Sequence, residues 1–368
     1  MAKNTQATAT TGRILSVDAL RGFDMFWIIG GGELAKALLS ISPNPVTNAL
    51  ARQFDHANWA GFRAWDIIMP LFLFIVGTSL PFSMSKRLVS PENRARVYRR
   101  IAKRFVILFI LGMAAEGNLL YFDISRLHVF CNTLQANAVG YAVAAILIMN
   151  VSVAWQAAVC IAVMAGFQII MSLVPVPGHA AGALDPGLNF ALYVDQAVMG
   201  RFHDGSSYTW VLSGMTFTAT VLMGVMSGHI LKSNRTQREK LAFLVLEGAG
   251  CTAAGLLMSI WFPIIKHIWS TSFTLFSGGL FFLLLTLFYW IVDVAGRARW
   301  AFFFIVVGSN SLLIYMLATV TATYMPASVV NAVLDSPPVV QGPLFAGFFA
   351  VEWGILYFLY RKKWFLSV

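Results

Sequence analysis

The sequence predicts an all-α protein: a polytopic integral membrane helical bundle of about ten transmembrane helices. Three observations lead to this fold class. Of the 368 residues, 58% are apolar and only 11% are charged, against about 25% charged in ordinary soluble domains. The apolar residues come in runs of roughly 18 to 24, long enough to cross about 30 Å of hydrocarbon as helices. Lysine and arginine concentrate in alternate connections between these runs, as they do on the cytoplasmic side of membrane proteins.

The apolar runs define the expected spans. They cover residues 15–39, 65–84, 104–119, 134–149, 154–174, 210–231, 241–263, 272–294, 301–320 and 343–360. The third run is short and ends in Glu116. The first is longer than a bilayer needs, so we expect it to tilt.

Orientation and domain organisation follow from the basic residues. With the N-terminus inside, all but six of the 26 lysines and arginines fall in cytoplasmic segments. The six outside are Lys36, Arg52, Arg63, Arg126, Arg201 and Lys266. We therefore expect both termini in the cytoplasm, with 1–13 as a cytoplasmic tail, 14–363 as a single transmembrane domain and 364–368 as a C-terminal tail. The outer loops 40–64, 175–209 and 324–342 are long enough to build a site.

Composition also excludes some classes of function. The net charge of +10 is dispersed over loops that flank the spans, which argues against a nucleic-acid partner. No histidine pair has helical metal-ligand spacing and the three cysteines have no metal or disulfide spacing, so no metal is expected. No internal repeat is visible, which disfavours a transporter built from inverted halves. The compact chain favours a bacterial cytoplasmic (inner) membrane.

Ionisable residues inside spans cost free energy unless they are paired or hydrated. Asp18, Arg21 and Asp24 share one face of the first span at i, i+3 and i+6. Two interpretations stay open for them: a structural ion cluster, or contact with an anionic substrate or cofactor. Glu33 follows three consecutive glycines near the outer face, where exposed backbone allows a neighbour or a ligand to approach closely.

His56 is the sharpest single candidate. It precedes the second span, with Asp66 ten residues further on. A histidine at this interface is either merely solvated or suited to proton transfer or acyl acceptance near neutral pH. Asp66 either orients the imidazole or favours the N-terminus of the helix that it begins.

Four other polar residues are weaker candidates. Gln135 and Asn310 lie within spans, where amides often only join helices by hydrogen bonds. Asn189 and Asp195 belong to the loop 175–209 and are candidates to bind sugar hydroxyls.

Several ordered blocks of sequence resemble one known family over nearly the whole chain. They are SVDALRG at 16–22, His56 with Trp59 and Gly61, AWDIIMPLFLFIVG at 64–77, Leu134-Gln135, the loop from Asn189 to Asp195, KHIWSTSF at 266–273 and GSNSLLIY at 308–315. In order and spacing they are similar to the heparan-alpha-glucosaminide N-acetyltransferase family and its bacterial relatives.

That resemblance implies transmembrane acetylation. Acetyl-CoA supplies an acetyl group from the cytoplasmic side, and an amino sugar of the glucosamine type accepts it on the outer side. The active histidine of the family corresponds to His56, which acts as base or acetyl carrier while Asp66 orients it. On this interpretation Arg21, Asp24, Gln135 and Asn310 serve the cofactor, and Glu33, Trp59, Asn189 and Asp195 serve the acceptor.

The chain also departs from the family. Ile28-Ile29 stands where animal members carry an asparagine, Ala60 replaces an asparagine, and Leu317-Ala318 stands where relatives often carry a histidine. Two alternatives therefore stay open: an O-acyltransferase of a cell-envelope glycan, and a non-catalytic transporter or glycan-binding protein on the same scaffold. The natural acceptor and an assembly of two copies also stay open.

Overall fold

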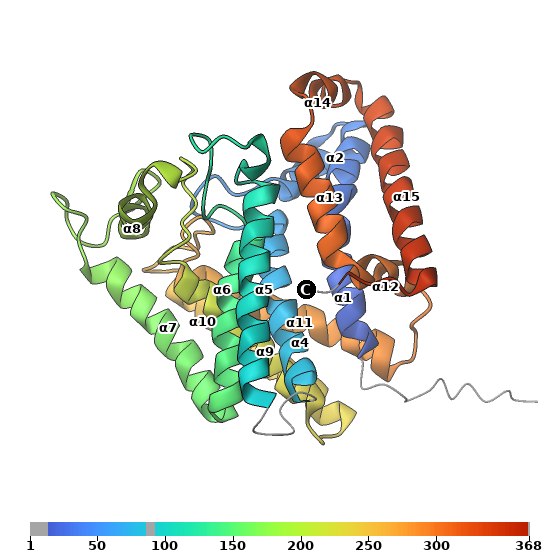
Figure 1. Ribbon diagram of the computed structural model, residues 1–368. Helices are drawn as coiled ribbons and strands as arrows, with labels where there is room; N and C mark the ends of the chain where they lie inside the picture. The colour runs from blue at the N-terminus through green and yellow to red at the C-terminus, as the bar shows by residue number, and fades with distance from the viewer. Residues whose placement is uncertain (1–13, 86–92, 367–368) are drawn as a thin grey trace, which may run out of the picture.

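The computed structural model describes residues 14–85 and 93–366, and it is built almost entirely of helices (Figure 1). The expected tail 1–13 lies outside the described residues, as do Lys86 and Arg87. The longer elements are α1 (Leu15–Phe26), α2 (Gly32–Ser40), α4 (Ile68–Ser85), α5 (Asn93–Ala115), α6 (Thr133–Asn150), α7 (Val153–Leu173), α8 (Phe190–Met199), α9 (Gly214–Lys232), α10 (Gln237–Met258), α11 (Thr271–Tyr289), α12 (Phe302–Ser309), α13 (Ser311–Tyr324) and α15 (Pro338–Lys362).

Short elements occupy the three expected outer loops. Loop 40–64 contains α3 (Pro45–Ala51) and η2 (Arg52–Phe54), and the 3₁₀ turn η3 (Ala64–Ile67) leads into α4. Loop 175–209 contains a two-stranded antiparallel hairpin, β1 (Leu184–Asp185) with β2 (Leu188–Asn189), then α8 and η5 (Gly200–Phe202). Loop 324–342 contains α14 (Ala327–Leu334). Three short segments remain: the 3₁₀ turn η4 (Leu119–Tyr121) and two π-helical segments, η1 (Trp27–Gly31) and η6 (Trp290–Val294).

The expected fold class is confirmed, with fewer unbroken spans than the sequence predicted. Within the described ranges, seven helical segments are long and apolar enough to cross a membrane, or eight if the bent pair α12–α13 counts as one span. All ten predicted runs fall on helices. The first run is not among the eight because its helix is broken, and the third because it lies in α5, whose first half is strongly basic.

The break in the first run has a local cause. Between α1 and α2 the chain passes through a π-helical turn, η1 (Trp27–Gly31), in which Gly30 has φ 126°. This backbone region favours glycine because a Cβ would be strained there. After the break, Gly32 packs against the ring of Trp65 so closely that any side chain at Gly32 would collide with the indole. The break therefore holds η3 against α2.

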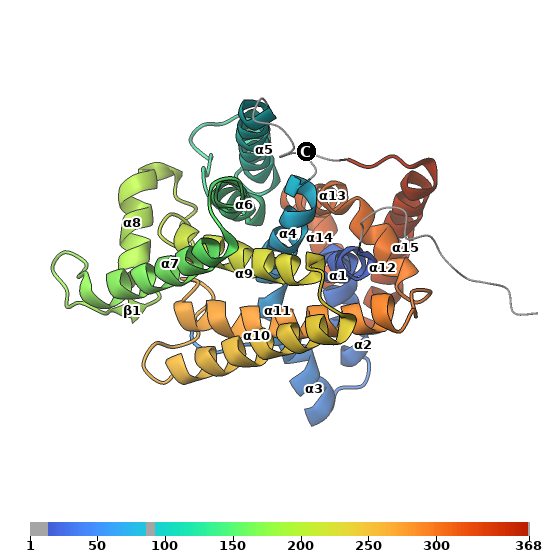
Figure 2. The ribbon, with the colours of Figure 1, turned by 90° about the horizontal axis from the view of Figure 1, so that it is seen from below.

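Close helix packing fixes the rest of the bundle. The α4 and α9 backbones approach until a Cβ at Gly77 would meet the Val221 carbonyl and one at Gly224 would meet that of Phe74. Small residues permit such contact between membrane helices. Figures 1 and 2 show α5 to α8 on one side of the bundle and α12 to α15 on the other, with α4, α9 and α11 between them.

Candidate active site

Asp66 organises the loop that carries His56. Its Oδ2 accepts hydrogen bonds from the backbone N–H of Arg63 (2.9 Å) and of Ala57 (3.3 Å), while its Oδ1 lies 2.8 Å from His56 Nδ1. The Asp66 side chain is 1% exposed. Because a carboxylate only accepts hydrogen bonds, His56 Nδ1 is the donor in this pair, which leaves the lone pair of the neutral imidazole on Nε2.

A second loop reaches the same place from the distant segment between α10 and α11. Ala60 pairs with Ile265 in an antiparallel bridge, and the Gly61 N–H donates to the Ile264 carbonyl (2.8 Å). This pairing brings in Lys266, whose Nζ lies 3.0 Å from His56 Nδ1, 3.4 Å from Nε2 and 3.6 Å from Asp66 Oδ1.

Lys266 is a buried cation in this cluster. It is 4% exposed, and burial lowers its pKa to about 8 even though the Asp66 carboxylate favours the charged form. Its neighbour His267 also has a lowered pKa, first because of burial and then because of the Lys266 charge. His267 stacks on Tyr208 with ring centroids 4.1 Å apart and accepts or donates a hydrogen bond at Ser207 Oγ (2.7 Å).

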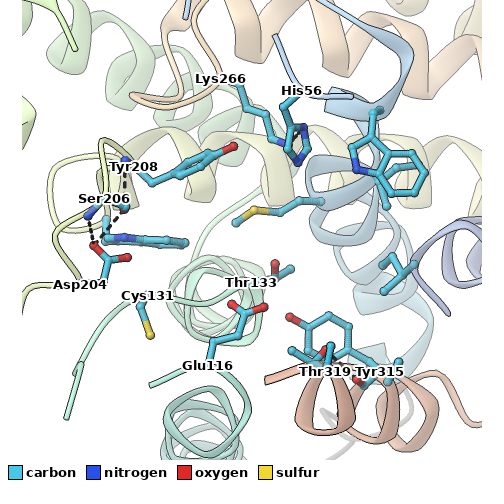
Figure 3. A pocket seen from close by; sticks show the side chains of 17 residues that line it. His56, Glu116, Cys131, Thr133, Asp204, Ser206, Tyr208, Lys266, Tyr315 and Thr319 are labelled. Atoms are coloured by element: carbon cyan, nitrogen blue, oxygen red, sulfur yellow. Dashed lines mark hydrogen bonds between the residues drawn. The ribbon is translucent and has the colours of Figure 1, made fainter. Parts of the chain in front are cut away.

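The cluster opens into a cavity of about 500 Å³. Figure 3 shows His56, Lys266 and Tyr208 on one side of this cavity, which we call the outer cavity, and Glu116, Thr133 and Tyr315 on the opposite side. At Ile28 and Ala318 the sequence departs from the family that it resembles, and both residues line the outer cavity. Leu317, the neighbour of Ala318 in the same departure, does not line it. A cavity of this size with few convergent polar groups is typical of a small-molecule site.

A second cavity of about 330 Å³, the inner cavity, lies along the same helices. Arg21 and Arg104 line it together with Ser79 and Asn137. The two cavities are separated by stacked rings: Phe72, which lines the inner cavity, lies parallel to Tyr315, which lines the outer one, with centroids 6.3 Å apart.

Arg21 is the predicted cofactor residue that the structure places at a cavity. Its guanidinium donates to Asp18 Oδ1 (3.2 Å) and to Ser79 Oγ (2.7 Å). Asp24 is fully buried, and its carboxylate has no hydrogen-bond partner within the described part of the chain. It lines neither cavity.

Gln135 and Asn310 have structural partners. Gln135 accepts from the Cys131 N–H (2.9 Å) and donates to two backbone carbonyls beside α6. Asn310 lies at the 74° bend between α12 and α13 and holds the C-terminal segment through Trp364 O (3.0 Å) and the Leu366 N–H (2.8 Å). Neither residue lines a cavity, so contact with a cofactor stays a prediction.

The four predicted acceptor residues support the outer loops. Glu33 pairs with Lys36 (3.4 Å), and Trp59 Nε1 donates to the Leu184 carbonyl (2.7 Å). Asn189 caps α8 by accepting from the Leu192 N–H. None of the four lines the outer cavity, and their contact with an acceptor stays a prediction.

Asp195 ties α8 to the segment before α9. It accepts from the backbone N–H groups of Trp210 (2.6 Å) and Val211 (2.9 Å) and is fully buried. Burial raises its pKa to about 7, although the two backbone hydrogen bonds favour the charged form.

Sequence reasoning gave no role to Lys266, Tyr208, Asp204 or Trp210, and noted Glu116 only as the end of a short run. Lys266 had a signal, because it is a lysine in a short outer connection between two spans and stands in one of the blocks that resemble the family. The other four become visible only when their loops are placed around the outer cavity.

Comparison with known proteins finds relatives that match most of the chain. A family model described as "Domain of unknown function (DUF5009)" matches residues 13–123, which include His56 and Asp66. Heparan-alpha-glucosaminide N-acetyltransferase of Homo sapiens is 26% identical over 380 residues, covering 85% of this chain and 54% of that protein. The protein of the same name from Mus musculus is 25% identical over 379 residues, covering 86% of this chain and 56% of its own length.

Over most of its length the chain is similar to these two proteins, which are named heparan-alpha-glucosaminide N-acetyltransferase. The resemblance seen in the sequence blocks is thereby confirmed. The chain spans about half the length of the curated relatives it matches.

Proposed function

We propose that this chain is a transmembrane acetyltransferase that moves an acetyl group from acetyl-CoA to an amino sugar of the glucosamine type. The observation that carries the proposal is the His56–Asp66 pair facing a cavity that is separated by one pair of stacked rings from a second, cationic cavity. The relatives named as N-acetyltransferases support the same chemistry.

His56 acts as the base in this proposal. Asp66 holds the Nδ1 proton, so Nε2 is free to take a proton from the acceptor amine as its nitrogen attacks the thioester carbonyl. When the tetrahedral intermediate collapses, the C–S bond breaks, and the proton held by His56 passes to the CoA thiolate. The same Nε2 lone pair is also able to receive the acetyl group itself, which would make His56 a transient carrier.

Lys266 stabilises the charge that develops during the attack. Its ammonium lies beside both ring nitrogens of His56 and lines the outer cavity, so it faces the region where the thioester oxygen becomes an oxyanion. A hydrogen-bond donor fixed at such a position stabilises the transition state more in a water-poor site than it would in bulk water.

The inner cavity is the entrance for acetyl-CoA. Arg21 and Arg104 supply positive charge for the anionic phosphates, and the expected orientation puts this end of the bundle toward the cytoplasm. The thioester then has to pass Phe72 and Tyr315 to reach His56. The amino sugar enters from the outer loops, on the opposite side of the bundle. The membrane in this proposal is a bacterial cytoplasmic membrane.

The test is acetyl transfer by the purified chain in nanodiscs, with acetyl-CoA labelled in its acetyl group and glucosamine as acceptor. We expect labelled N-acetylglucosamine and free CoA thiol in equal amounts, and loss of both in His56→Ala. The matched control is His179→Ala, because His179 is an exposed histidine of an outer loop away from both cavities. Absence of transfer by folded wild-type protein would refute the proposal. Label retained on wild-type protein before glucosamine is added, and absent from His56→Ala, would identify His56 as a carrier.

A further inference from the structure

Lys266 places a primary amine inside the candidate active site. Its side chain extends toward the His56 ring on one wall of the outer cavity (Figure 3). Its Nζ lies 3.4 Å from His56 Nε2, the ring nitrogen that carries the lone pair. The acceptor in the proposed reaction is also a primary amine, and it has to lie beside the same Nε2 to lose its proton. Lys266 therefore stands where a competing acceptor would stand.

The backbone on both sides of Lys266 is fixed. Ile265 pairs with Ala60 in the antiparallel bridge, and the Ile265 N–H donates to Ser270 Oγ (3.0 Å). The Lys266 carbonyl accepts from the Trp269 N–H (2.9 Å), which closes a tight turn. An acetyl group delivered to the histidine thus comes within reach of Nζ, and a nucleophile held about 3 to 3.5 Å from its reaction partner reacts far faster than the same group in free solution.

Burial also supplies the neutral form that a nucleophilic amine requires. The titratable groups around Lys266 are Asp66, His56 and His267, and burial lowers the pKa of Lys266 to about 8 although the Asp66 carboxylate favours the charged form. At pH 7 about a tenth of the molecules then hold a neutral Lys266, against fewer than about one in a thousand for an ordinary lysine. The charged majority stabilises the oxyanion, and the neutral minority is a nucleophile.

We propose that Lys266 is a self-acetylation site, which takes the acetyl group when acetyl-CoA is bound without an acceptor. This inference rests on the proposed acetyl transfer. The neutral Nζ attacks the thioester carbonyl carbon, an N–C bond forms as the C–S bond breaks, and His56 Nε2 carries the released proton to the CoA thiolate. An acetyl group already on Nε2 passes to Nζ in the same way, with the imidazole as leaving group. The amide formed has no positive charge, so the oxyanion loses its cation and transfer stops.

Peptide mass spectrometry of the purified chain in nanodiscs tests the site directly. With labelled acetyl-CoA and no glucosamine, we expect label on Lys266 at least about tenfold faster than on Lys363, an exposed lysine outside both cavities that reports purely chemical acetylation. His56→Ala should abolish this difference, His179→Ala should preserve it, and excess glucosamine should protect Lys266. The label should resist hydroxylamine, which removes an acetyl group from an imidazole but not from an amide, so Lys266 is distinguished from a transient carrier.

Loss of activity gives the second measurement. Preincubation with acetyl-CoA should inactivate wild-type protein in proportion to the fraction of Lys266 acetylated, whereas Lys266→Arg should lose none of its own initial rate because its guanidinium stays protonated. Transfer to glucosamine with Lys266 labelled no faster than Lys363 would overturn this inference and leave the proposed function standing. Stable, His56-dependent label on Lys266 without transfer to glucosamine would support the inference and overturn glucosamine as the acceptor. Neither label nor transfer would overturn both.

Discussion

Lys266 gives the sharpest prediction for the pH dependence of acetyl transfer. Because burial lowers its pKa to about 8, Lys266 is about 90% charged at pH 7 and about 10% charged at pH 9. The sign follows directly: raising the pH through 8 removes the proton, and with it the charge that stabilises the oxyanion. We therefore expect kcat, measured with saturating acceptor, to fall about tenfold from pH 7 to pH 9.

Two substitutions test whether Lys266 causes this fall in kcat, which is the alkaline limb of the pH–rate profile. Lys266→Met keeps the length of the side chain without its charge, and should lower kcat by about 10² to 10³ and abolish the limb. Lys266→Arg keeps a charge that does not titrate in this range, so it should recover part of the rate and show a flat profile up to pH 9. Circular dichroism and thermal unfolding in the same detergent control for folding. A limb near pH 8 that persists in Lys266→Met would refute the role given to Lys266.

The remaining predictions concern orientation, packing and the outer loop. Asp66→Asn should lower kcat by about 10² to 10⁴ because the amide no longer fixes the His56 tautomer; wild-type kcat in this variant would contradict the pairing. Asp195→Asn should lower the unfolding temperature, because an amide has only one acceptor oxygen and one of the two backbone N–H groups would lose its acceptor. The control Asp185→Asn should leave the unfolding temperature unchanged. Gly224→Ala should destabilise the protein through collision with a carbonyl of α4, whereas Gly250→Ala, where a Cβ meets nothing within 4 Å, should be neutral or stabilising; equal unfolding temperatures would contradict the packing.

The fold was largely predictable because the bilayer imposes a length and a polarity on each span. Every predicted run falls on a helix. The break after α1 was not predicted, since hydropathy does not register the positive φ of Gly30. The bend at Asn310 had a signal in the polar residues 309–311, but its angle depends on the C-terminal segment that this amide holds.

The site was predictable only where its residues are close in sequence. His56 and Asp66 are ten residues apart, and the hydrogen bond between them is present in the structure. Lys266 is 210 residues from His56, and the backbone bridge between Ala60 and Ile265 places it beside the histidine. No local sequence pattern predicts this bridge. Polar residues such as Asn189 attracted a ligand-binding interpretation because a sequence does not reveal that the backbone is their partner.

The most direct test of the account is a sided assay in proteoliposomes. Acetyl-CoA labelled in its acetyl group is supplied on the side of the inner cavity, and glucosamine on the side of the His56 loop. The account predicts labelled N-acetylglucosamine on the glucosamine side, with His56→Ala inactive and His179→Ala active. Transfer that is unaffected by His56→Ala, or no transfer by wild-type protein in either orientation of the substrates, would contradict it.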